Sequence, residues 1–172
     1  PAEGICEVVL YSSNHHSSLG EESEEHIRNL IEVWTDRYIE LGRKPGIQYI
    51  FIFENKGDAV GVTLSHPHGQ IYAFPFIPPT LEKELQAALE HQTATDKCLY
   101  CDIMAEEKED KVRVIAENQE FMSFVPFFAR YPFEVHIYAK RHVTNLAELT
   151  PEEQEGLAAL LKEVLVKYDS LF

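Results

Sequence analysis

The sequence predicts an α+β fold built from two similar halves. Three observations lead to this prediction: short β-prone runs alternate with helical patterns, a strand-histidine-helix segment recurs along the chain, and a His-Pro-His sequence stands at the start of a strand. With 172 residues, of which 45% are hydrophobic, the chain can bury one core of ordinary domain size.

Six runs rich in β-branched and aromatic residues predict strands. They are Glu7 to Tyr11, Ile47 to Phe53, Gln70 to Phe76, Val112 to Ala116, Phe121 to Val125 and Glu134 to Ala139. Pro78 and Pro79 stop the third run. We expect Cys6 to be a buried strand residue.

Apolar residues at three-and-four spacing predict the first helix. They are Ile27, Leu30, Ile31, Trp34, Tyr38 and Leu41. Ser23 is a suitable N-cap for this helix. Leu81 to Leu89 predicts a short acidic helix, followed by a polar loop through Asp96. A last helix is expected to start at Thr150 and Pro151, as N-cap and first helical position, and to run to the end.

The two halves share a pattern of residues at a constant offset. In the first half these residues are Leu10, Tyr11, His15, Leu19 and Ser23, and in the second Ile137, Tyr138, His142, Leu146 and Thr150. Two unrelated strand-helix units can share such spacing by chance, but the paired histidines at the strand ends favour a duplication. We therefore predict a first repeat over 1–92, truncated at its start, and a second over 93–172, truncated at its end.

The composition narrows the classes of partner. A net charge of −14 would repel a polyphosphate backbone, so nucleic acid is not expected as a partner. The longest apolar run is too short for a membrane span, and no signal segment is evident, which favours a cytoplasmic protein. The chain begins at Pro1 and its last helical pattern has no stop signal, so we expect an internal fragment.

One short segment, His66-Pro67-His68-Gly69-Gln70, carries the residue types needed for nucleotidyl transfer. Side chains two apart on a strand project to the same face, so we expect the two imidazoles to be neighbours. Imidazole is an uncharged nucleophile that can leave again, and the Gln70 amide can donate to phosphoryl oxygens. Gly69 would let backbone approach phosphate. Taken alone, the segment is equally compatible with an ordinary turn that exposes two histidines.

This segment, with Phe53-Glu54-Asn55-Lys56-Gly57 before it, resembles the active site of galactose-1-phosphate uridylyltransferases. That family is a branch of the histidine-triad superfamily, whose hydrolases carry a third histidine where this chain has Gln70. The resemblance extends over nearly the whole chain. It implies duplicated half-barrels, in which an antiparallel sheet packs with helices. It also implies a homodimer that uses a sugar nucleotide and a sugar phosphate.

The resemblance assigns roles to individual residues. His68 would attack the α-phosphorus of UDP-glucose, and galactose 1-phosphate would then take the uridylyl group from His68 in a ping-pong reaction. Gln70, Asn55 and Thr63 fall where the family contacts the nucleotide's phosphates, and Lys56 could offset phosphate charge. Thr63 replaces the more usual serine. For Asn55 and Thr63, turn chemistry before a strand is the alternative.

The family also binds metals, and several residues here match its ligands. A zinc site would use His15 and His66 with two cysteines located before Pro1, and His16 competes with His15. A second site would use Cys98, Cys101 and His142, although Cys98 and Cys101 are equally compatible with reduced core cysteines. Some members instead bind iron through residues that match Glu84 and His142, but Glu84 also fits a solvated helix face.

Two other readings of the function remain open. The first is a related nucleoside phosphorylase or adenylyltransferase of the same superfamily, which would share His68 and prefer adenine. The second is a non-catalytic zinc-binding domain in which His66 and His68 are only ligands. Gln70 and the glycine-containing loop favour an enzyme, because a purely structural metal site needs neither.

Overall fold

The computed structural model describes residues 3–57, 60, 62, 64 and 66–171, and within these it shows two three-stranded antiparallel sheets. The first sheet contains β1 (Ile5–Leu10), β2 (Tyr49–Phe53) and β3 (His68–Phe74), in the order β1-β3-β2. The second contains β4 (Val114–Glu117), β5 (Phe121–Phe124) and β6 (His136–Ala139), in that order. The predicted α+β fold is therefore confirmed.

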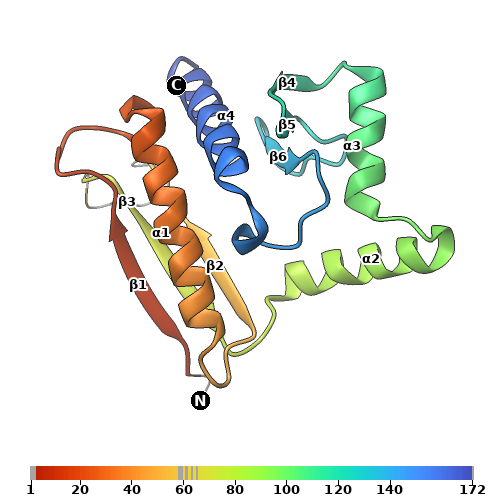
Figure 1. Cartoon of the computed structure of the whole chain (residues 1–172), viewed down its shortest axis with the longest axis horizontal. Coiled ribbons are helices and arrows are strands. Elements are labelled where there is room, and N and C mark those ends of the chain that lie inside the picture. Colours follow the sequence, from red (N-terminus) through yellow and green to blue (C-terminus); the bar gives the residue numbers. More distant parts are fainter. Residues whose placement is uncertain (1–2, 58–59, 61, 63, 65, 172) are drawn as a thin grey trace.

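Helices connect and cover the sheets (Figure 1). They are α1 (Glu24–Gly42), α2 (Pro79–Thr95), α3 (Leu99–Asp110) and α4 (Pro151–Asp169), with short 3-10 helices at Leu19–Glu21 and Leu146–Glu148. In Figure 1, α1 runs along the first sheet, α4 lies beside α1, and the second sheet lies between α4 and α3. The long α2 links the two parts of the chain.

The two long amphipathic helices form as the sequence predicts. Ser23 caps α1 by accepting a hydrogen bond from the His26 backbone nitrogen over 3.1 Å, and Thr150 caps α4 in a capping box with Glu153. One core cluster joins the two helices to the end of β1. It contains Tyr11, Leu19, Ile27, Leu30, Ile31 and Ala158. Burial of these apolar side chains fixes the end of β1, and with it the segment that carries His15.

The structure corrects the sequence prediction at α2 and α3. The predicted short helix continues to Thr95 and ends at Asp96 in a left-handed conformation, so no loop lies between Leu89 and Asp96. Helix α3 was not predicted at all. It buries only Ile103 and Glu107, so its sequence lacks the apolar period that marks a surface helix. Arg113 pairs with the buried Glu107 carboxylate at 2.9 Å, which explains a charge inside this helix.

The prediction for Cys6 was wrong, because its side chain is exposed. Strand β1 alternates between half-buried and exposed residues. Glu7 and Val9 lie on the side of α1, where Glu7 pairs with Arg37 at 2.7 Å. Cys6, Val8 and Leu10 therefore project to the opposite face of the first sheet.

The corresponding segments of the two halves share local structure, but their strands bury different faces. Leu19 and Leu146 each begin a 3-10 helix, and Ser23 and Thr150 each cap the long helix that follows. By contrast, Leu10 is 63% exposed, whereas its counterpart Ile137 packs into the core under α4. The sequence correspondence thus extends to the helix starts, while the sheets pack differently against their helices.

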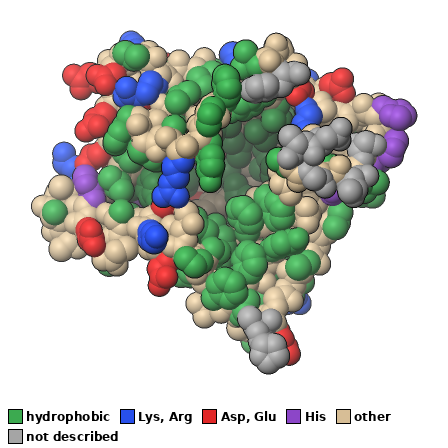
Figure 2. Space-filling model, turned by 180° about the vertical axis from the view of Figure 1, so that it is seen from behind, with side chains coloured by type: hydrophobic (Ala, Val, Ile, Leu, Met, Phe, Trp, Pro, Cys, Tyr) green, Lys and Arg blue, Asp and Glu red, His purple; other side chains and the backbone are tan. Residues whose placement is uncertain are grey.

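The surface carries many exposed apolar side chains. Seen from behind, the molecule is hollowed near its centre and hydrophobic side chains gather around the hollow (Figure 2). The first sheet exposes Val8, Leu10 and Phe51, and the segment after β5 exposes Phe127, Phe128 and Phe133. Among the described residues, no helix combines the length and the apolar character that a membrane crossing requires.

Candidate active site

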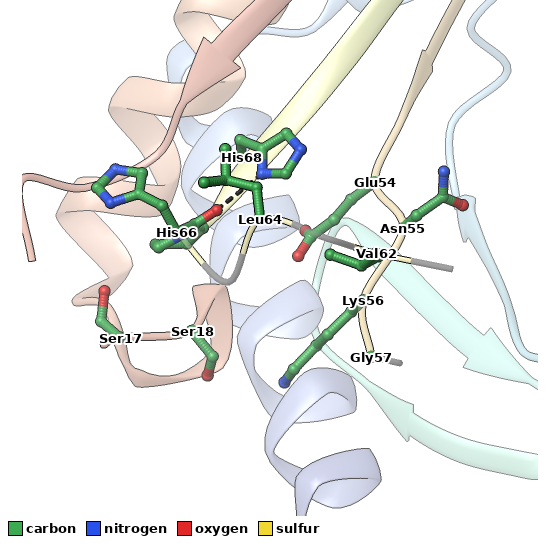
Figure 3. A pocket seen from close by; sticks show the side chains of 11 residues that line it. Ser17, Ser18, Glu54, Asn55, Lys56, Gly57, Val62, Leu64, His66 and His68 are labelled. Carbon is green, nitrogen blue, oxygen red and sulfur yellow. Dashed lines mark hydrogen bonds between the residues drawn. The ribbon is translucent and has the colours of Figure 1, made fainter. Parts of the chain in front are cut away.

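Strand β3 starts with the motif that the sequence singled out. His68 and Gln70 are two apart on this strand and share its face, next to Leu10 and Val8 of β1. The His68 ring nitrogen Nδ1 lies 2.7 Å from the backbone oxygen of His66 (Figure 3). A carbonyl oxygen only accepts, so Nδ1 must carry the proton. The neutral His68 imidazole therefore has its lone pair on Nε2.

The expectation that the two imidazoles are neighbours on one face was wrong. Strand β3 begins at His68, so His66 lies outside the regular alternation of the strand. Figure 3 shows the two rings pointing away from each other, with only the His66 backbone oxygen turned to His68. The two histidines of the motif therefore point in different directions. His68 faces the pocket, and His66 points toward the loop after β1.

His15 lies next to His66, at a separation that suits two ligands of one metal ion. Their Nδ1 atoms are 3.1 Å apart, and ligand nitrogens on a tetrahedral zinc ion are separated by about 3.3 Å. The Nε2 atom of His66 is buried and lacks a hydrogen-bond partner among the described residues. His16 stacks edge-on against His15, with ring centroids 5.0 Å apart. The geometry therefore fits zinc and favours His15 over His16 as the ligand beside His66.

Gly69 is required by close packing beneath the motif. A Cβ atom at this position would lie 1.9 Å from the Tyr11 hydroxyl oxygen. Tyr11 is buried, and its backbone nitrogen donates to the Pro67 oxygen over 3.0 Å, which ties the end of β1 to the start of the motif. The expected reason for Gly69 was access to phosphate, and the structure adds this steric reason.

A pocket of about 310 Å³ lies beside His68 (Figure 3). It is lined by Ser17, Ser18, Glu54, Asn55, Lys56, Gly57, Val62, Leu64, His66, Pro67 and His68. Two of the predicted phosphate-binding residues, Asn55 and Lys56, are among them. Figure 3 shows the Asn55 amide turned away from Glu54 and Lys56. Thr63, another predicted phosphate-binding residue, lies outside the described residues.

The Glu54 carboxyl group lines the pocket, and no role was predicted for it. Burial raises its pKa, against the opposing effects of the positive charge on Lys56 and of His68. In Figure 3 the carboxylate points toward the space between His68 and Lys56. Its place directly after β2 and next to Asn55 was the available signal.

Gln70 lies on the same face as His68 but is not among the residues that line the pocket. The oxygen of its amide accepts a hydrogen bond from the Tyr72 hydroxyl over 3.0 Å. Among the described residues the Gln70 amide nitrogen has no hydrogen-bond partner, which leaves its two hydrogens for a ligand.

The three residues of the second predicted metal site lie close together in the structure. Ligand atoms of Cys98, Cys101 and His142 all lie within 4.8 Å of one another. Cys101 Sγ is 3.4 Å from His142 Nδ1, and a sulfur and a nitrogen bound to one tetrahedral zinc ion are about 3.5 Å apart. Three soft and borderline donors converging from α3 and from the segment after β6 fit zinc. This cluster lines a second hollow of about 240 Å³.

Glu84 does not belong to this cluster. It is exposed on α2. Burial raises the pKa of Tyr138 to about 12, with smaller contributions from Tyr100 and from the charge of Glu84. Burial and the charge of Glu84 also raise the pKa of Tyr100. Both tyrosines line the hollow beside Cys98 and Cys101. Glu84 therefore faces this region, and its role as an iron ligand stays a prediction.

Sequence reasoning missed the side chains that reach the pocket from other elements. Ser17 and Ser18 enter it from the loop after β1, and Asp169 at the end of α4 contacts both Ser18 and Lys56. Asp169 is 113 residues from Lys56 in the chain. No local pattern could have joined these residues, because the packing of α4 against α1 brings them together.

The fold and the site together define a histidine-triad-like α+β protein: an antiparallel sheet presents His68 beside a pocket that polar and apolar side chains line together. Comparison with known proteins makes the assignment specific. Residues 1–78 match the family described as "Galactose-1-phosphate uridyl transferase, N-terminal domain", and residues 82–172 match its "C-terminal domain". The chain belongs to the galactose-1-phosphate uridylyltransferase family.

Individual relatives agree with this assignment. The chain is 45% identical to a galactose-1-phosphate uridylyltransferase of Thermotoga maritima, over 99% of this chain and 53% of that protein. It is 34% identical to the enzyme of the same name from Rattus norvegicus, over 99% of this chain and 45% of the relative. The chain thus spans about half the length of the curated relatives it matches.

Solved structures of two kinds share the fold. A uridylyltransferase structure superimposes with a TM-score of 0.88 at 37% identity, covering 92% of this chain and 51% of that one. An ADP-glucose phosphorylase from Arabidopsis thaliana, solved with bound ADP-glucose, gives a TM-score of 0.86 at 32% identity. That match covers 94% of this chain and 50% of the other.

Proposed function

We propose that this chain carries the nucleophile of a uridylyltransferase that exchanges UMP between UDP-glucose and galactose 1-phosphate. The observation that supports this most directly is the hydrogen bond between His68 Nδ1 and the His66 backbone oxygen at 2.7 Å. It holds the imidazole in the one neutral tautomer that presents Nε2 as a nucleophile. The family relationship supplies the substrates.

In the first half-reaction, the Nε2 lone pair of His68 forms a bond to the α-phosphorus of UDP-glucose. The bond from that phosphorus to the bridging oxygen breaks, and glucose 1-phosphate leaves with the electron pair. In the second half-reaction, a phosphate oxygen of galactose 1-phosphate attacks the same phosphorus, and the nitrogen–phosphorus bond breaks to return the electron pair to Nε2. The products are UDP-galactose and free His68.

Neighbouring groups would support both steps. Nδ1 keeps its proton and donates it in a hydrogen bond to the His66 oxygen, and this oxygen stabilises the positive charge that the imidazole gains when phosphorus is attached. The Gln70 amide, with its oxygen engaged by Tyr72, donates to phosphoryl oxygens. Lys56 supplies positive charge, and Asn55 and Thr63 are proposed as further phosphate contacts. Because glutamine, unlike histidine, cannot activate water as a base, Gln70 favours transfer over hydrolysis.

We propose that zinc is held at two places. His15 and His66 would hold one ion, and Cys98, Cys101 and His142 would hold another. A bound zinc ion would supply a structural cross-link that fixes the start of β3 and the loop after β1. Elemental analysis tests this: Cys101→Ser is expected to lower zinc content in the full-length protein, and Cys6→Ser, at an exposed cysteine outside both clusters, to leave it unchanged. Equal zinc in both variants would refute the second site.

We infer that the functional protein is a cytoplasmic homodimer, as the family resemblance implies. The large exposed apolar side chains support burial against further protein surface, which a second subunit would supply. Light scattering on the full-length protein tests the stoichiometry, and a monomer at micromolar concentration would contradict it.

The substrate class is tested by looking for the covalent intermediate. The full-length protein is incubated with UDP-glucose alone, or with ATP or ADP-glucose alone, and its intact mass is measured. We expect a uridylyl adduct that is absent from His68→Asn. An adenylyl adduct instead would favour the phosphorylase or adenylyltransferase function. The similarity to an ADP-glucose phosphorylase structure supports that alternative. A protein that forms no adduct with any of the nucleotides would favour the non-catalytic zinc-binding reading.

A further inference from the structure

The side chain of Lys56 is held in place from the other half of the molecule. Its ammonium group forms an ion pair with the Asp169 carboxylate, and Asp169 is the last residue of α4. Lys56 lines the pocket beside His68, whereas Asp169 does not. In Figure 3 the Lys56 side chain points away from Asn55 and toward the pale blue helix α4, which ends at Asp169. The pair therefore decides where the pocket's lysine lies.

A second contact ties Asp169 to the pocket from the opposite wall. The Ser18 hydroxyl donates to Asp169 Oδ2 over 3.3 Å, and Ser18 also lines the pocket. Gly20 lies just beyond, and a Cβ atom there would approach the same Asp169 oxygen to 3.1 Å. One carboxylate thus contacts residues of two pocket walls, the loop after β1 and the loop after β2.

The charges around the pocket explain why this contact matters. The chain is strongly acidic, and Glu54 lies inside the pocket, so a bound diphosphate depends on the few cations available there. A free lysine side chain samples many rotamers, and binding a ligand with it costs entropy. Because Asp169 already restrains the ammonium group, less of that cost falls on ligand binding.

We propose that Asp169 is a positioning residue, which holds the Lys56 ammonium group at the pocket for the phosphates of the sugar nucleotide. This inference rests on the proposed function, because it assumes that the pocket receives a nucleoside diphosphate sugar. It makes the nucleotide pocket of the first half depend on the last helix of the second. The ion pair itself is half-exposed, with 50% of the Lys56 side chain and 37% of the Asp169 side chain accessible. Its contribution is therefore to position rather than to stability.

The test measures the first half-reaction alone in the full-length protein. Formation of the His68 adduct is followed after rapid mixing with UDP-glucose, over a range of concentrations and without galactose 1-phosphate. For Asp169→Asn we expect the half-saturating UDP-glucose concentration to rise between about threefold and tenfold, while the limiting rate changes less than about twofold. Asp169→Glu keeps a carboxylate that can pair with the Lys56 ammonium group, so we expect it to recover most of the loss.

A double-mutant cycle separates positioning from an independent effect. Lys56→Met should weaken UDP-glucose binding at least as much as Asp169→Asn does. The double variant should bind UDP-glucose as well as Lys56→Met alone. Glu163→Gln is the matched control, because Glu163 pairs with Lys167 on the same helix but outside this pocket. It should leave the half-saturating concentration unchanged, and thermal melting should show all variants folded.

Three results would overturn the inference. They are unchanged binding in Asp169→Asn, additive losses in the double variant, and a loss in Glu163→Gln as large as that in Asp169→Asn. The proposed function has a separate criterion, since it fails if His68→Asn still acquires the uridylyl group. An inactive His68→Asn together with an unaffected Asp169→Asn would therefore reject the positioning role and leave the nucleophile in place.

Discussion

Replacing Gly69 by alanine tests how tightly the start of β3 is packed. The added Cβ atom would lie 1.9 Å from the Tyr11 hydroxyl oxygen, 2.6 Å from Cζ and 2.9 Å from Cε1. Three contacts below 3.0 Å cannot be relieved by a hydroxyl rotation, so the buried ring or the strand must move. Overpacking of this kind costs roughly 1–3 kcal/mol, and three simultaneous contacts place Gly69→Ala near the upper end, at about 3 kcal/mol.

Urea denaturation followed by circular dichroism measures this cost. Tyr11→Phe in the Gly69→Ala background removes the closest atom but leaves the two ring carbons below 3.0 Å, so it should recover part of the stability. Gly42→Ala is the matched control, because its Cβ would meet only the Ile50 side chain at an ordinary 3.5 Å and alanine favours a helix. A Gly69→Ala protein within about 0.5 kcal/mol of the parent would refute the packing argument.

Three further predictions concern charge and capping. Arg113→Met leaves the Glu107 carboxylate buried without its partner and should cost about 3 kcal/mol by urea denaturation, whereas Arg28→Met, at an exposed pair with Glu32, should cost less than about 1 kcal/mol. Equal costs would contradict this reasoning. Thr150→Ala removes the N-cap of α4 and should cost about 1 kcal/mol in the same assay, and no loss would show that the cap is dispensable. The pKa of Glu153 is lowered to about 2 by Arg141 and the Thr150 backbone, so its contribution is complete above the ordinary value of 4.5 and is lost as pH falls toward 2. The urea midpoint of Glu153→Gln should therefore fall less than that of the parent between pH 5 and pH 3, and parallel curves would reject this.

The sequence predicts much of this fold because its helices and strands carry clear local signals. The caps at Ser23 and Thr150 and the apolar period between them and the helix ends are local features, and both helices form where predicted. Helix α3 was not predicted because Glu107, buried and paired with Arg113, occupies a position where an apolar residue would be expected. Cys6 was misplaced because strand alternation does not reveal which face a helix will cover.

The residues of the site also fall into those with a local sequence signal and those that only the fold brings together. His68 and Gln70 could be located from one pentapeptide, and Cys98 and Cys101 from their spacing, because each signal lies within a few residues. The pairing of His15 with His66 and of Cys101 with His142 is made by the fold, and the sequence could only suggest it through the repeat. Asp169 carries no local signal, since it reaches Ser18 and Lys56 only through the packing of α4.

The proposed role of His68 as the nucleophile can be tested by finding which ring nitrogen carries the phosphorus. The full-length protein is labelled with ¹⁵N-histidine, treated with UDP-glucose, and studied by NMR for coupling between phosphorus and ring nitrogen. Because Nδ1 of His68 is engaged with the His66 oxygen, we expect a uridylyl group on Nε2 of His68 and no coupling in His68→Asn. Phosphorus on Nδ1, or on any residue other than His68, would contradict it.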